Sequence, residues 1–551
     1  MNEKRSEAAP NRSWYSFVPI FGELLDEVFH PERRPYRRHG DREDRTRRIK
    51  ARVLSILTLV SGGAYLLWLP NVLNPEHPIM ASAFMAAEAL CLALFTVAMV
   101  DAWRLRFKPQ GALEPERDYR VDVFVPVCGE PIDVVRRTLD GVKRIRWGGP
   151  IERFILDDGD SPEVRRLAGE LGFTYLSRGA RTGDPEVDNK AANLNFGLTN
   201  SRGELVLVMD ADQVPEREII EALAGYMKFP GVGFVQSKQT FLVPEDDPFN
   251  SNDPVFYDAV QMANDDGDTV LSCGSGVLYR RAALDEIGGF ATWNLVEDLT
   301  TSFELHSKGW KSFYYPYPLS YGLAPDTIGG VYQQRSQWAL DTMRLIYWDN
   351  PLLKKGLSWR GRLNYMMVGV TYLAAALVFP FFFLVPVWTY LTGSTVLSSW
   401  EWEFLAYRAP YFLLMILALS YLFRKQSTGK QFQLIAGLFP VFLGATVRAL
   451  IYPPGRKPGY KTNNVLRTRR LKHPVVAVLP QALLFGANAL LPFYAAWTGV
   501  APLRVIVVTS FVSAFALWSL WPVLDAALGP GRWLPAAEPH ESYQRVGQAN
   551  V

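Results

Sequence analysis

The hydrophobic residues of this 551-residue chain follow two different patterns. Two nearly continuous apolar windows, about 51–71 and 79–102, are joined by the short polar turn NPEHP. Similar windows return later, at about 363–391, 408–423, 475–497 and 503–525. Most approach or exceed the ~20 residues that a membrane-spanning helix needs. We therefore expect two spans, a soluble region and then four spans; for the first pair, buried core helices are the alternative.

Between about 115 and 330 the pattern changes to short apolar runs separated by helical segments. The runs read VDVFVPV, RFILDDGD, ELVLVMDAD and VGFVQSKQ. Short β-rich runs alternating with helices predict an α/β domain with a largely parallel sheet. Ligands of such sheets bind outside the carboxyl ends of the strands, and the acidic clusters of this chain fall at those ends.

Positive charge gives the expected orientation. Arginine and lysine residues flank both N-terminal windows on the side of the soluble region, which favours a cytosolic location for that region. The apolar stretch 432–452 precedes the basic loop GRKPGYKTNNVLRTRRLKH. A span there would place that loop outside the cell, so we expect an interfacial helix on the cytosolic surface instead. Both termini are then cytosolic, and three scattered cysteines without metal-ligand spacing fit a reducing compartment.

These patterns predict eight regions along the chain. They are a basic cytosolic segment (1–50), two spans (51–102), the catalytic α/β domain (115–330), an interfacial region (331–362), two spans (363–423), an interfacial helix with a basic loop (424–474), two spans (475–526) and a short cytosolic tail (527–551).

Pairs of carboxylates end two of the predicted strands. Asp210 and Asp212 follow ELVLVM, and Asp157 and Asp158 follow RFIL. Hard oxygen ligands suit Mg²⁺ or Mn²⁺, and such an ion can neutralise a diphosphate leaving group. A lone D-x-D is a weak signal, and the bland alternative for the upstream pair is a turn cap.

Three further segments carry candidate chemistry. Lys190, in DNKAANLNFGL, could reach a phosphate as a point charge, or simply begin a surface helix. The small residues of CGSG allow backbone to approach a ligand, or form a plain loop. Asp298, in WNLVEDL, begins a helix, where a carboxylate is either a cap or a general base.

The order of these segments is more specific than any one of them. DDG, NKAAN, DAD, CGS, VED and Q-x-x-x-W occur in sequence, with apolar windows on both sides. This order resembles the processive family 2 glycosyltransferases, and most closely bacterial cellulose synthase catalytic subunits. The resemblance implies an α/β GT-A domain, inserted between transmembrane helices, that transfers a sugar with inversion from a UDP-sugar to a growing glycan.

The resemblance also implies roles for particular residues. It assigns catalysis to Asp298 as the general base, with Glu297 beside it. Donor binding falls to Glu130, Asp157, Asp158, Lys190, Asp210 and, by position, Arg335 and Gln337. Acceptor binding falls to Trp338, Gln334, Cys273, Gly274 and Ser275. Asp210 and Asp212 would hold Mg²⁺ or Mn²⁺, and Tyr460, Thr462 and Asn463 lie where the family has a gating loop.

One departure from the family pattern bears on function. Gln337 stands where the family has an arginine that helps to hold the donor diphosphate. Three hypotheses therefore stay open: a processive synthase using UDP-glucose, a nonprocessive transferase making a short or lipid-linked glycan, and a noncatalytic channel subunit. The expected partners are a UDP-sugar, a polysaccharide acceptor, the lipid bilayer and periplasmic accessory subunits, without nucleic acid. The expected location is the bacterial inner membrane.

Overall fold

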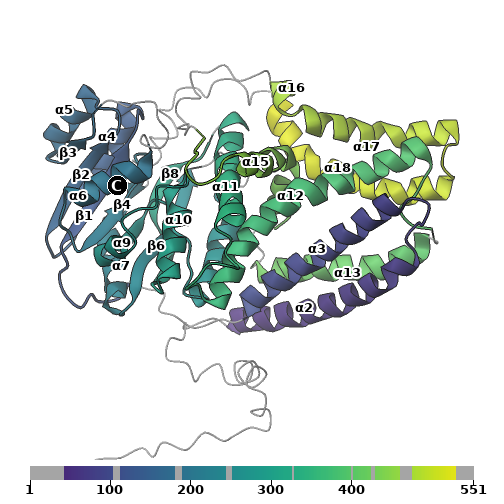
Figure 1. Ribbon diagram of the computed structural model, residues 1–551, viewed down its shortest axis with the longest axis horizontal. Coiled ribbons are helices and arrows are strands. Elements are labelled where there is room, and N and C mark those ends of the chain that lie inside the picture. Colours follow the sequence, from purple (N-terminus) through teal and green to yellow (C-terminus); the bar gives the residue numbers. More distant parts are fainter. Residues whose placement is uncertain are drawn as a thin grey trace, which may run out of the picture.

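The computed structural model places an α/β domain beside a bundle of long helices (Figure 1). It describes residues 42–103, 112–179, 189–242, 251–325, 328–398, 401–423, 428–458 and 474–528. Helix α11 (Ile328–Trp348) lies between the two parts in Figure 1. Tyr460, Thr462 and Asn463 lie outside the described residues.

The domain is built on one mixed sheet with the strand order β3-β2-β1-β4-β7-β6-β8-β5. Strands β3, β2, β1 and β4 are parallel neighbours, whereas β7 is antiparallel to both β4 and β6. Strands β6 and β8 are also parallel, and β5 is antiparallel to β8. The expectation of a largely parallel sheet is therefore confirmed, with β7 and β5 as the two strands that run the other way. The bounds are β1 (Val121–Val127), β2 (Ile151–Asp157), β3 (Thr174–Ser177), β4 (Leu205–Val208), β5 (Gln213–Pro215), β6 (Val232–Leu242), β7 (Val277–Arg280) and β8 (Lys311–Leu323).

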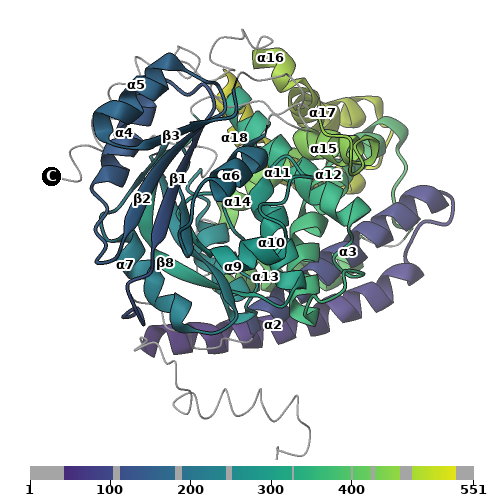
Figure 2. The same cartoon turned by 60° about the vertical axis from the view of Figure 1, so that its left-hand side comes forward.

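Helices cover both faces of the sheet, which explains the continuous apolar runs in its strands. All seven residues of β1 are buried. One face packs on α4 (Ile132–Lys143), α5 (Pro162–Leu171) and α7 (Ile219–Ala224). The opposite face packs on α6 (Lys190–Thr199) and α9 (Arg281–Glu286), with α10 (Glu297–Ser307) beside them (Figure 2). That second face is turned toward the helical bundle.

Six helical segments among the described residues are long and apolar enough to cross a membrane. They are Arg47–Asn71, Pro78–Val100, Trp359–Thr392, Trp402–Leu422, Leu479–Thr498 and Leu503–Leu528. They belong to α2 (Arg42–Trp68, continued by a 3₁₀ turn), α3 (Pro78–Trp103), α12 (Trp359–Thr392), α13 (Glu401–Leu422), α17 (Leu479–Thr498) and α18 (Leu503–Leu528). Each overlaps one of the apolar windows of the sequence.

Residues 429–451 form a bent pair rather than one straight helix. Helices α14 (Thr428–Gly437) and α15 (Phe439–Ile451) meet at 55°, a geometry that fits a broken span or a re-entrant segment. Helix α15 packs along α11, so its C-terminal end approaches the α/β domain. The proposed interfacial helix at 432–452 is thus two short helices joined at a break.

One ion pair lies inside the bundle. Arg408 of α13 donates to Glu88 of α3 at 2.8 Å, and the Glu88 side chain is only 1% exposed. Charged groups at such depth are stable only when paired. This pair therefore fixes α3 against α13.

Candidate active site

Lys190 connects several of the candidate site residues at the rim of the sheet. It begins α6, whose first turn is capped by the Asn189 side chain accepting from Ala192 N at 2.9 Å. The Lys190 ammonium lies 2.6 Å from Asp210 Oδ1 and 2.9 Å from Glu297 Oε1, and it donates to Gly274 O at 3.1 Å. Four of the sequence segments singled out above, 190, 210, 274 and 297, therefore meet at one ammonium group.

The charges around Lys190 determine the protonation of this cluster. Burial alone would lower the pKa of Lys190, but the carboxylates of Asp210 and Glu297 outweigh burial and raise it well above its usual value. Burial and the neighbouring Glu297 raise the pKa of Asp298 well above that of a free carboxyl, whereas Lys190 lowers it. Asp298 is thus a stronger base than an exposed aspartate, which suits a group that must accept a proton.

Gly274 is positioned by both its backbone and its lack of a side chain. Its φ is +75°, and a Cβ there would lie 3.0 Å from both Asp298 Oδ2 and Lys190 Nζ. The neighbouring Ser275 accepts from Asp210 N at 2.9 Å. Only glycine combines this φ with such close approach at low cost, so the CGS loop brings base and lysine together.

Two glutamines of β6 hold this loop, and the motif search did not find them. Gln236 donates to Ser275 O at 2.9 Å and accepts from Cys273 N at 2.7 Å. Gln239 donates to the same Ser275 carbonyl at 2.8 Å. Both are buried and belong to the polar run QSKQT inside β6, and a polar run within a predicted strand is the signal that sequence reasoning overlooked.

Asp212 and Glu130 form an acidic group beside Asp210. Burial and the charges of Asp210 and Glu130 raise the pKa of Asp212 to about 7. Burial also raises the pKa of Glu130, while the hydrogen bond from Cys128 N at 2.5 Å opposes the rise. A bound cation would relieve the mutual repulsion of these carboxylates. Among the described residues no three metal-ligating side chains meet, so remaining ligands would come from diphosphate and water.

The upstream pair of aspartates has two different environments. Asp157 accepts from Gly159 N at 2.8 Å, from Ser161 N at 2.7 Å and from the Tyr175 hydroxyl at 2.8 Å. It therefore caps the turn after β2. Asp158, also buried, pairs with Arg178.

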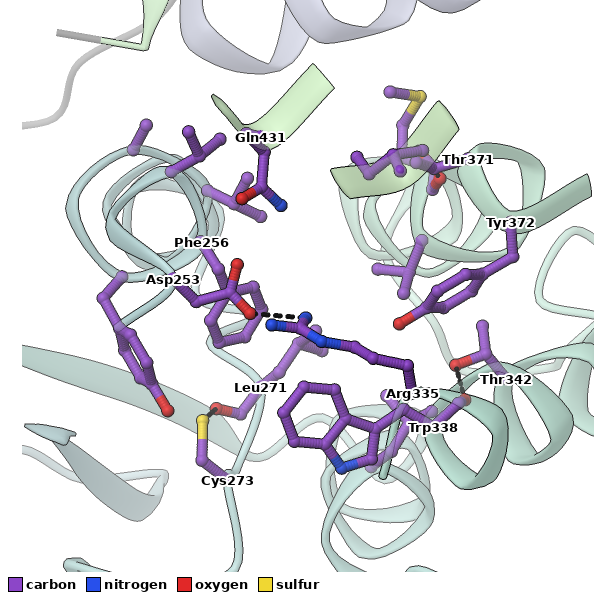
Figure 3. A pocket seen from close by; sticks show the side chains of 18 of the residues that line it. Asp253, Phe256, Leu271, Cys273, Arg335, Trp338, Thr342, Thr371, Tyr372 and Gln431 are labelled. Atoms are coloured by element: carbon purple, nitrogen blue, oxygen red, sulfur yellow. Dashed lines mark hydrogen bonds and ion pairs between the residues drawn. The ribbon is translucent and has the colours of Figure 1, made fainter. Parts of the chain in front are cut away.

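A pocket of about 420 Å³ lies next to this cluster and reaches the helical bundle. Asp298, Cys273, Gln334, Arg335 and Trp338 line it. Figure 3 shows Cys273, Arg335 and Trp338 among the lining side chains. Neither Lys190, Asp210, Asp212 nor Glu297 does. The remaining lining comes largely from apolar side chains of the segment 255–263 and of α12, α14 and α15, including Phe256, Met367, Val368, Leu434, Ile435 and Phe442, together with Leu271 of the loop before β7. The two acids at the start of α10 thus divide: Glu297 joins the lysine cluster and Asp298 lines the pocket.

Helix α11 is tied to the loop that carries these acids. Asp341 accepts from Val296 N. Arg344, fully buried, donates to Asn294 Oδ1 at 2.7 Å, to Trp293 O at 3.1 Å and to Tyr452 O at 2.9 Å. The guanidinium thus holds the segments near 293 and 452 against α11. Trp338 lies two turns earlier on the same helix.

The comparisons with known proteins agree with this geometry. Residues 205–445 match the model of "Glycosyl transferase family group 2". The chain is 32% identical over 369 residues to "Cellulose synthase 1" of Komagataeibacter xylinus, covering 62% of this chain and 22% of that protein. It is also 32% identical over 336 residues to "Cellulose synthase catalytic subunit [UDP-forming]" of Pseudomonas fluorescens, covering 58% of this chain and 44% of that protein.

By sequence, this chain is similar to cellulose synthases and, over residues 205–445, to family 2 glycosyltransferases. Its mixed sheet with helices on both faces is the GT-A-like domain expected of such a protein, flanked by long apolar helices. The chain spans less than half the length of these curated relatives. Among solved structures, a mannosyltransferase from Pyrobaculum calidifontis in complex with GDP-Man and Mn²⁺ is 20% identical, with a TM-score of 0.48, covering 67% of this chain and 99% of that one.

Proposed function

We propose that this glycosyltransferase transfers glucose from UDP-glucose, with inversion, to the nonreducing end of a β-glucan, and that the product leaves through the membrane helices. The observation that carries the proposal is the division at the start of α10. Glu297 binds Lys190 together with Asp210, and Asp298 lines a pocket that reaches the helical bundle. A charged donor and a neutral acceptor would meet at that boundary.

The proposed reaction is a single displacement. A hydroxyl of the acceptor attacks the anomeric carbon of the donor, and its proton passes to Asp298. A new glycosidic C–O bond forms while the bond to the diphosphate breaks, and UDP leaves with the electron pair. Lys190 places a positive charge at the donor side, and Trp338 offers an indole face to the apolar C–H face of a pyranose.

The metal proposal rests on the acidic residues. Asp210 and Asp212 would hold Mg²⁺ or Mn²⁺, and Glu130 adds to the negative charge that favours a cation there. When bound, such an ion neutralises charge on the departing diphosphate. Within the chain, Ser275 fixes the Asp210 backbone, and Lys190 holds one Asp210 oxygen.

A nonprocessive transferase is the second candidate, and Gln337 is the observation that favours it. Glutamine brings no charge to a place where the family holds the donor diphosphate with arginine. Weaker retention of the donor would favour short products. The cellular location proposed for either activity is the bacterial inner membrane, with the catalytic domain and both termini in the cytosol.

A donor screen tests the proposal. Purified protein in lipid vesicles would be given single UDP-sugars with Mg²⁺ or Mn²⁺, and released UDP, product linkage and product length would be measured. UDP-glucose should give UDP and a β-linked glucan. Long product identifies the processive enzyme and short product the second candidate, while absence of turnover with every donor would favour the noncatalytic channel subunit.

A further inference from the structure

A buried ion pair crosses the pocket beside Trp338. Arg335 Nη1 lies 2.6 Å from Asp253 Oδ2, and each side chain is 10% exposed. The guanidinium lies 4.8 Å from the Trp338 ring centroid. Figure 3 shows Arg335 extending from α11 over the indole toward Asp253, which comes from the segment before Phe256. Both charged groups therefore lie in the pocket that Asp298 also lines.

The backbone on the Asp253 side departs from regular geometry. Asp253 has φ +45°, which costs a non-glycine residue about 1–3 kcal/mol. Directly after it, Phe256–Val260 form a π-helical turn, a feature that often occurs at functional sites. Burying two charges adds a further cost that pairing only partly repays. Backbone strain and buried charge therefore occur together in the segment around Asp253, which lines the pocket.

Another buried pair of the same residue types shows what a purely structural arrangement looks like. Arg281 binds Asp122 at 2.8 Å, with side chains 15% and 0% exposed. Its other nitrogens donate to the carbonyls of Gly203 and Leu198, so the guanidinium fastens loops together. Arg335 differs, because its Nε is buried without a hydrogen-bond partner among the described residues. Arg335 lines the pocket and binds Asp253 through Nη1, so its other terminal nitrogen, Nη2, is the one that can donate to a ligand there.

We propose that Arg335, held in place by Asp253, determines acceptor specificity by donating hydrogen bonds to hydroxyl groups of an uncharged sugar that binds beside Trp338. The inference rests on the proposed function and deepens it. The Arg335–Asp253 pair is neutral overall and its other surroundings include Phe256, Leu271 and Tyr372. An acceptor with a carboxylate or phosphate would add an uncompensated charge near Asp253. The sequence had grouped Arg335 with the donor residues, whereas this assignment moves it to the acceptor.

The test separates acceptor use from donor use. The double variant Arg335→Gln/Asp253→Asn removes both charges together, so neither is left buried and unpaired. In vesicles with UDP-glucose, UDP release without a sugar acceptor measures donor hydrolysis by water. Transfer to cellotetraose measures acceptor use, and an oligosaccharide ending in glucuronate measures selectivity.

In the double variant the ratio of transfer to donor hydrolysis should fall relative to wild type. Transfer to cellotetraose should fall about tenfold or more, the effect of losing a hydrogen bond from a charged donor. The preference for cellotetraose over the glucuronate-ended acceptor should become smaller as well. The matched control Arg281→Gln/Asp122→Asn should lower the melting temperature without changing the ratio of transfer to hydrolysis.

Two results would overturn the inference. One is unchanged transfer in the double variant, and the other is an equal fall of transfer and hydrolysis, which marks a structural role. A wild type that turns over no UDP-sugar would overturn the proposed function, and this inference with it.

Discussion

The two sides of α10 differ in how they use charge. On the proposed donor side, Asp210 and Glu297 each lie within hydrogen-bonding distance of the Lys190 ammonium. On the acceptor side, the pocket is mostly apolar and its charges are paired with each other, as in Arg335–Asp253. A diphosphate needs fixed charges that favour its departure. A neutral glycan that must also move onward needs weak contacts, so the difference matches what each substrate demands.

Removing the base should have the largest effect. Asp298→Asn keeps the shape of the side chain but cannot accept a proton. One general base contributes about 10²–10⁴-fold, so transfer to cellotetraose should fall by about that factor. Radiolabelled UDP-glucose binding should change little, because the Lys190 cluster stays intact. Wild-type transfer rates in Asp298→Asn would show that another group removes the proton and would break the division proposed at α10.

Removing the lysine should disturb the proposed donor side most. Lys190→Met leaves Asp210 and Glu297 without their shared cation, and breaking a buried pair costs about 3–5 kcal/mol. Lys190 is 21% exposed, so we expect the lower end of that range, measured by denaturant unfolding, together with weaker donor binding. Lys354→Met is the matched control, because Lys354 also bridges two carboxylates, Glu304 and Asp349, at similar exposure. The control should lose stability but keep donor affinity; equal loss of affinity in both would refute the donor role.

Adding a methyl group at Gly274, between Asp298 and Lys190, should have a smaller effect. In Gly274→Ala the new Cβ would press on Asp298 and Lys190 at 3.0 Å, and the positive φ adds about 1–2 kcal/mol of strain. Gly231→Ala has φ +79° but open space around the Cβ, so it carries the strain alone. Turnover should fall about tenfold more in the first variant than in the second, measured as kcat for UDP release with cellotetraose. Equal kcat values would mean that the close approach of Gly274 is unimportant.

The smallest expected effect is the change of the transfer rate with pH. Burial and Glu297 raise the pKa of Asp298, so at a given pH more of it is protonated than of a free aspartate. Only the ionised form can accept a proton, and transfer should therefore rise as pH increases through that raised pKa. The acidic limb should be missing from the residual activity of Asp298→Asn. A flat profile in wild type would argue against Asp298 as the titrating base.

The sequence alone determined the elements and much of the candidate site. Apolar windows long enough to span a bilayer, and short β-rich runs ending in acids, are local patterns that depend only on residue order. The ordered motifs around 158, 190, 210, 274 and 298 carried the family resemblance, and the structure brings Lys190, Asp210, Gly274 and Asp298 together.

The tertiary structure decided which residues serve which side. Asp253 and Arg335 are 82 positions apart, and Arg344 joins segments near 294 and 452, so no local pattern links them. Antiparallel β7 likewise depends on pairing between distant strands. The role proposed for Arg335 depends on where its guanidinium points, and the ion pair with Asp253 holds that direction. Hydrophobic periodicity encodes which face of a helix is buried, but the partner across that face is fixed only when the chain folds.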